Sequence, residues 1–122
     1  MLGIICAALS LILVPLTMVI CGGWFIKSPP DPESGIGYRT RRSLHSADTW
    51  IAAHRICGRI WLFAGIVSLI TAVLGGVFMA VKGLETDDEL YNVILIEEAV
   101  QLAFLLGAIP VTESRLKKMF HI

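Results

Sequence analysis

Length and composition exclude a soluble globular domain. The chain has 122 residues, of which 56% are hydrophobic and 16% charged, and its mean hydropathy is +0.76. This is one domain's worth of chain and too apolar to be solvated as a globule, so we expect a single membrane domain over residues 1–122. Ten basic residues balance ten acidic ones, and net charge therefore gives no reason to expect a nucleic-acid partner. Cys6, Cys21 and Cys57 have no CxxC spacing, which favours buried or interfacial thiols over a disulfide framework or a zinc site.

Three segments are long and apolar enough to cross a bilayer. They cover residues 2–26, 58–81 and 91–111, and each provides the roughly 20 apolar residues that a spanning helix needs. Backbone groups in hydrocarbon must bond within their own segment, so all three should be helices. The first segment has no basic residue before it and exceeds the roughly 7–15 apolar residues of a signal peptide, so we expect it to be retained. The predicted fold is an all-α membrane protein with three transmembrane helices.

The basic residues predict the orientation of these helices. Nine of the ten lie in the connection 27–57, at the start of the second span or in the C-terminal tail, whereas Lys82 alone lies between the second and third spans. Because basic residues that flank spans remain cytoplasmic, we predict that the connection and the C-terminus are inside and the N-terminus outside. The acidic turn then lies outside as well, and it contains Glu85, Asp87, Asp88 and Glu89.

The cytoplasmic connection 27–57 has two predicted parts. Residues 28–35 contain three prolines and should leave the membrane as an extended, turn-rich segment. Ser46 is a suitable N-cap, and Asp48 suits the positive end of a helix dipole, so we expect a helix to begin at Ala47. Apolar and aromatic residues then recur at helical spacing and predict an interfacial amphipathic helix that leads into the second span. They are Trp50, Ala53, His54, Cys57 and Trp61.

Two stretches of the chain carry a family resemblance. The first contains Gly37, Tyr38, Arg39, Thr40, Ser43, Ser46, Trp50, His54, Arg55 and Gly58, and the second contains residues 109–113 with Leu116, Lys117 and Phe120. Both resemble the SdpI family of bacterial membrane proteins, which includes immunity proteins against a secreted killing peptide. Family members often carry Asn where this chain has residues 32–34, and long members have extra N-terminal helices, so this chain resembles a minimal three-span core. The resemblance implies a multi-pass protein of the bacterial cell membrane with a role in bacteriocin resistance or signalling.

Glu113 is the predicted partner of the basic residues in the connection. It follows the third span and should emerge on the same side as Arg39 and Arg55. We expect one of these two arginines to pair with it, since a guanidinium suits a carboxylate. A local pair between Glu113 and Lys117 on one helix face is the alternative. The predicted cytoplasmic site therefore contains Gly37, Tyr38, Arg39, Thr40, Ser43, Trp50, His54, Arg55 and Glu113.

The spans themselves contain small residues and carboxylates in regular positions. Small residues recur every four positions at Ala64, Ser68, Ala72 and Gly76, and again at Ala99, Ala103 and Gly107, so we expect these two seams to face each other. The third span also contains Glu97, Glu98 and Gln101, which need polar partners in the membrane. We expect Glu97 to face the first helix, where Ser10 could donate to it, or another subunit.

The sequence gives no indication of an enzyme. It lacks HExxH, a Gly-x-Ser-x-Gly elbow and a phosphate-binding loop. His45, His54 and His121 should lie at the inner face, whereas Glu97 and Glu98 lie in the outer half, so these groups should not share a metal ion. We therefore expect no catalytic residues, metal or cofactor.

Two functions remain open from the sequence. The first is a membrane binding protein that resists or senses a membrane-active peptide, as the resemblance implies, with anionic lipid or a cytoplasmic regulator as further partners of its arginines. The alternative is a small transporter or an ion- or lipid-handling protein that uses the intramembrane glutamates. Because three spans bury little surface and Glu97 is expected to point away from the seam, we also expect a homo-oligomer, most simply a dimer.

Overall fold

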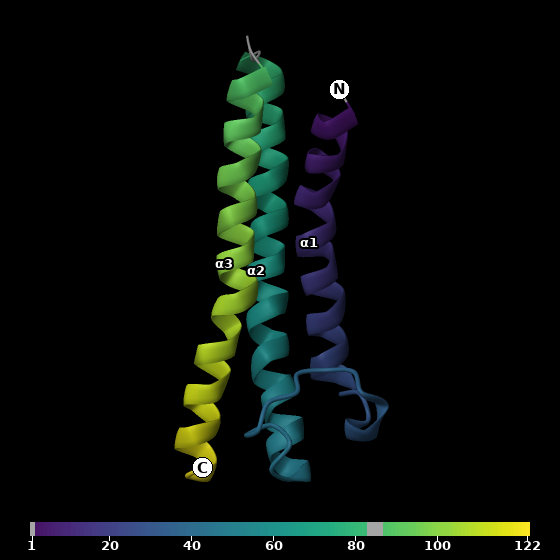
Figure 1. Cartoon of the computed structure of the whole chain (residues 1–122), viewed down its shortest axis with the longest axis vertical. Helices are drawn as coiled ribbons and strands as arrows, with labels where there is room; N and C mark the ends of the chain where they lie inside the picture. Colours follow the sequence, from purple (N-terminus) through teal and green to yellow (C-terminus); the bar gives the residue numbers. More distant parts are fainter. Residues whose placement is uncertain (1, 83–86) are drawn as a thin grey trace.

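Three long helices form the molecule in the computed structural model, which describes residues 2–82 and 87–122. They are α1 (Leu2–Lys27), α2 (Ala47–Lys82) and α3 (Asp87–Phe120), and a single 3-10 turn, η1 (Pro32–Ser34), lies in the connection between α1 and α2 (Figure 1). Each helix is long and apolar enough to cross a membrane, which confirms the predicted all-α membrane fold. Glu85 of the predicted acidic turn lies outside the described residues, whereas Asp87, Asp88 and Glu89 begin α3.

The amphipathic segment and the second span form one continuous helix. Its start at Ala47 confirms the prediction, because the backbone N–H of Thr49 donates to Ser46 Oγ over 3.1 Å while the N–H of Ser46 donates to Thr49 Oγ1 over 2.8 Å. No proline interrupts the 36 residues of α2, so the amphipathic segment forms the first turns of this helix. The helix is about 54 Å long, and it therefore extends well beyond a hydrocarbon core of about 30 Å.

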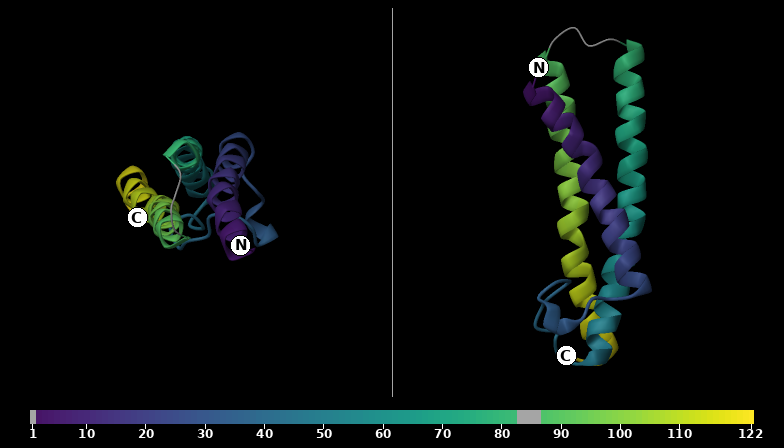
Figure 2. Two further views of the ribbon diagram at one scale, coloured as in Figure 1. Left: turned by 90° about the horizontal axis from the view of Figure 1, so that it is seen from above. Right: turned by 90° about the vertical axis from the view of Figure 1, so that its right-hand side faces the viewer.

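Helix α1 crosses the other two obliquely, and its C-terminal half lies against α2 (Figure 2). Glycines permit this close approach. A Cβ atom added to Gly22 would lie 2.6 Å from the carbonyl oxygen of Gly58, and one added to Gly65 would lie 2.9 Å from that of Pro15. Since no side chain larger than hydrogen fits at these contacts, Gly22, Gly58 and Gly65 fix the crossing of α1 and α2.

The predicted pairing of small-residue seams is wrong for α3. Ala64 and Ser68 are buried, but Ala99 and Ala103 are exposed, and a Cβ atom added to Gly107 would contact nothing within 4 Å. The helix instead turns its polar residues inward. This arrangement is favoured because an unsatisfied polar group exposed to hydrocarbon costs more free energy than an exposed alanine.

The apolar core lies at the end of the bundle that holds the connection. Residues of the connection, α2 and α3 pack there around buried side chains, namely Tyr38, Ala53, Ile56, Cys57, Ala108 and Leu116. The connection and the C-terminus lie at this same end (Figure 1). This packing holds the polar residues of the connection against the ends of two helices.

Candidate functional site

His54 is the centre of the assembled site. It is fully buried on the first turns of α2, and its Nε2 accepts the backbone N–H of Tyr38 over 2.9 Å. Nε2 therefore has no proton, and the proton on Nδ1 is donated to the carbonyl oxygen of Trp50, 2.8 Å away. Because both ring nitrogens are engaged in this way, His54 is a neutral imidazole that joins the connection to α2.

Gly37 allows the connection to approach His54. Its φ of +114° is rarely adopted by residues with a side chain. A Cβ atom at this position would also lie 2.6 Å from His54 Nε2 and 2.9 Å from Cγ of Pro30. Both the backbone conformation and the available space therefore require glycine here.

A second set of hydrogen bonds closes the loop between Tyr38 and α2. The hydroxyl of Ser43 donates to the carbonyl oxygen of Tyr38 over 2.9 Å and accepts the N–H of Thr40 over 2.8 Å. The hydroxyl of Thr49 donates to the carbonyl oxygen of Ser43 over 3.1 Å. Ser43 and Thr49 are both buried, so these bonds fix the loop within the core.

Glu113 ties the connection to α3. The phenol of Tyr38 donates to Glu113 Oε1 over 2.7 Å, and Arg42 Nη1 lies 3.1 Å from Oε2 in an ion pair. Arg42 Nε also donates to the carbonyl oxygen of Ile122 over 3.3 Å. Burial raises the pKa of Tyr38 well above its usual value, and the hydrogen bond to Glu113 and the charge of that carboxylate raise it further.

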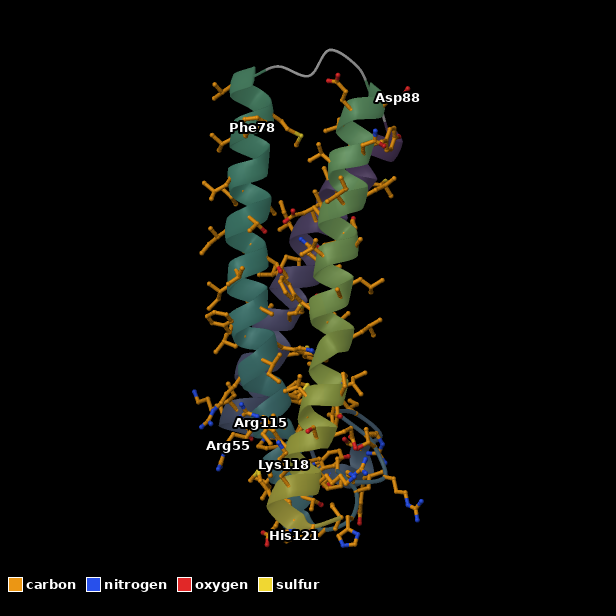
Figure 3. The ribbon with its side chains drawn as sticks, turned by 90° about the vertical axis from the view of Figure 1, so that its left-hand side faces the viewer. Arg55, Phe78, Asp88, Arg115, Lys118 and His121 are labelled. Carbon is orange, nitrogen blue, oxygen red and sulfur yellow. The ribbon has the colours of Figure 1, made fainter. Side chains whose placement is uncertain are left out.

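The predicted pairing of Arg39 or Arg55 with Glu113 is therefore wrong. Arg39 donates to the carbonyl oxygen of Pro32, and its guanidinium lies 5.7 Å from the centroid of the Trp50 ring. Arg39 is therefore held by Pro32 and Trp50 and forms no ion pair with Glu113. Arg55 is exposed on the side of α2 away from the connection (Figure 3).

Sequence reasoning missed two further members of the site. Arg42 was not considered as a partner for Glu113, although it belongs to the same basic run as Arg39. Phe25 of α1 packs edge-on against His54 with ring centroids 4.7 Å apart. No sequence pattern distinguishes Phe25 from the other apolar residues of its helix.

The polar residues within the membrane join α3 to both other helices. The Thr71 hydroxyl donates to Glu97 Oε1 over 2.6 Å, Ser10 donates to Glu98, and the Gln101 amide donates to the carbonyl oxygen of Leu11 over 3.0 Å. The expectation that Glu97 faces the first helix is therefore wrong, since its partner lies on α2 and Ser10 binds the adjacent glutamate. Contact of Glu97 with another subunit, and the dimer, stay predictions.

The assembled site is suited to holding groups in place. Among residues 2–82 and 87–122, no cluster of three or more His, Cys, Asp or Glu residues could hold a metal ion. The lone pair of His54 is already occupied by a backbone N–H, so this imidazole is not available as a general base. Beside the site, an open pocket of about 560 Å³ is lined by Arg41, Arg42, His45 and Ile122, and this pocket has cationic walls.

Comparison with known proteins identifies the family of this chain. Residues 31–112 match the SdpI/YfhL protein family, so the match includes most of the connection, all of α2 and most of α3. No curated protein and no solved structure gives a significant match. The matched region contains the glycine, tyrosine, serine, tryptophan and histidine that form the hydrogen-bonded site. This chain belongs to the SdpI/YfhL family of multi-pass membrane proteins.

Proposed function

We propose that this chain is a binding protein of the bacterial cell membrane that protects against, or senses, a membrane-active antimicrobial peptide. The observation that carries the proposal is that the two stretches resembling the family meet in one site at one end of the bundle. Tyr38 connects His54 on α2 with Glu113 on α3. Such a fixed arrangement is suited to presenting a surface to a partner.

The two ends of the molecule differ in charge, and this suggests a division of roles. The basic residues at the end of the bundle next to the connection support a cytoplasmic location for it under the positive-inside rule. Its cationic pocket, lined by Arg41, Arg42 and His45, would receive an acidic regulator. The start of α3, with Asp88 and Glu89, would face outward and attract a cationic peptide.

The intramembrane polar residues support a second proposal, a small ion transporter. The buried oxygen atoms Ser68 Oγ and Gln101 Oε1 have no hydrogen-bond partner among the described residues, as expected of a polar path. We rank this proposal second because Glu97 and Glu98 both accept hydrogen bonds from neighbouring helices. These bonds give the two carboxylates a role in helix packing.

A killing assay tests the first proposal. Cells with and without the chain would be exposed to a panel of membrane-active peptides, and we expect expression to protect against at least one cationic member. Protection against none would contradict the proposal.

A double variant separates the two functions. Glu97→Gln with Glu98→Gln keeps an acceptor oxygen for each hydroxyl, so we expect protection to be retained at matched amounts of membrane protein. Loss of protection together with loss of proton-coupled flux would favour the transporter.

A further inference from the structure

A groove between α2 and α3 lies outside the site described above. It has a volume of about 490 Å³ and combines an apolar floor with two arginines, and its lining consists of Ile56, Arg59, Ile60, Phe63, Ala64, Val67, Phe104 and Arg115. Phe63 and Phe104 are exposed to the surroundings of the bundle, and 73% of the Phe63 surface is accessible, whereas Ile56 and Ala64 are buried beneath the groove. In a membrane this face contacts acyl chains.

The two arginines come from different helices and meet at one groove. Arg59 and Arg115 are both exposed, and neither guanidinium forms a hydrogen bond or ion pair with the described part of the chain. Arg55 and Arg115 lie near the same end of the bundle, toward its C-terminus (Figure 3). Uncompensated guanidinium groups at this position form a site for an anion, and their planar donor groups match the geometry of a phosphate.

The position of Arg59 along α2 places this charge at headgroup depth. From Arg59 to the end of α2 at Lys82, the helix rises about 35 Å, which slightly exceeds a hydrocarbon core of about 30 Å. When the far end of α2 reaches one membrane surface, Arg59 therefore reaches the other. The apolar part of the groove then lies in the adjoining leaflet.

We propose that this groove binds a phospholipid with an anionic headgroup, in the leaflet on the side of the connection. The phosphate would lie between Arg59 and Arg115, and an acyl chain would follow Phe63, Val67 and Phe104. Charge complementarity and the apolar floor together select this occupant, because a soluble anion would use the arginines alone. Basic pockets between transmembrane helices commonly bind lipid headgroups in this way.

Native mass spectrometry of the purified full chain in detergent tests the site. Phosphatidylglycerol and phosphatidylcholine with the same acyl chains would be titrated separately, and we expect the anionic lipid to bind at lower concentration. Arg59→Gln with Arg115→Gln should weaken its binding about 30-fold, since each basic side chain contributes roughly fivefold near an anionic headgroup. The matched control, Lys27→Gln with Lys117→Gln, removes the same charge outside the groove and should have a much smaller effect.

A second variant tests the apolar part without changing charge. Val67→Trp fills the groove floor and should weaken phosphatidylglycerol binding while the circular dichroism of the helices stays unchanged. Equal binding of the two lipids, or equal losses in the arginine pair and its control, would overturn the proposal. Competition by soluble glycerol phosphate at lipid-like concentrations would also overturn it, because it would show an anion site that does not need the acyl chain.

Discussion

Replacing Gly37 by alanine tests the packing of the connection against α2. The φ of +114° costs an L-residue about 1–2 kcal/mol. The added methyl group would also lie 2.6 Å from His54 Nε2 and 2.9 Å from Pro30 Cγ, and relieving such overpacking typically costs about 1–3 kcal/mol. We therefore expect Gly37→Ala to reduce the free energy of unfolding by about 2–5 kcal/mol, mainly by displacing Tyr38 from His54.

Gly35→Ala is the matched control for this prediction. Gly35 also has a positive φ, of +79°, but a Cβ atom there would contact nothing within 4 Å. It should lose only the backbone contribution of about 1–2 kcal/mol. Both values are measurable by equilibrium unfolding in mixed micelles of mild detergent and dodecyl sulfate. If Gly37→Ala costs no more than Gly35→Ala, the contact between the connection and His54 does not stabilise the protein, and the reasoning is refuted.

Three further predictions concern the helix crossing, the ion pair and Tyr38. Gly22→Ala should destabilise the folded protein by several kcal/mol, because the new methyl group would lie 2.6 Å from the backbone of α2. The control Gly75→Ala adds a methyl group that meets nothing within 4 Å, and it should stabilise the helix by about 0.8–1.0 kcal/mol. Similar changes in stability for the two variants in thermal unfolding would contradict the close crossing of α1 and α2. A double-mutant cycle of Arg42→Gln and Glu113→Gln should give a coupling of about 1 kcal/mol, and a coupling of zero would argue against the pair at 3.1 Å. Because the pKa of Tyr38 is raised in the folded state, the unfolded chain loses the phenol proton at a lower pH than the folded chain does. The contribution of Tyr38 to the free energy of unfolding should therefore be constant below pH about 10 and should fall above it. Tyr38→Phe should remove that decrease, and an unchanged alkaline profile in this variant would show that another group is responsible.

The sequence was sufficient to predict the helices, because the requirement for internal backbone bonding in hydrocarbon determines them. The helix start at Ala47 was also readable, since Ser46 supplies a local cap that depends on nothing distant. Both predictions rest on the properties of single segments. The hydrophobic length and the local capping of a segment do not depend on how the helices pack against one another.

Contacts between segments were harder to predict. The small residues of α3 suggested a packing face, but the inward turn of Gln101 and the glutamates placed Ala99 and Ala103 outside. Glu113 was identified as the partner of the connection, but its arginine was not, because the choice between Arg39 and Arg42 depends on the direction of each side chain in an irregular loop. Glycine contacts such as Gly22 with Gly58 became visible only once α1 and α2 were placed together.

The placement of the connection in the cytoplasm is the claim on which the proposed division of roles depends. Thiol labelling of intact cells tests it directly, in a chain whose three native cysteines are replaced by alanine. Ser34 is exposed in the connection and Asp88 is exposed at the opposite end of the bundle. We predict that a membrane-impermeant maleimide labels the Asp88→Cys variant in intact cells and labels Ser34→Cys only after permeabilisation. Labelling of Ser34→Cys in intact cells, with Asp88→Cys protected, would contradict the account.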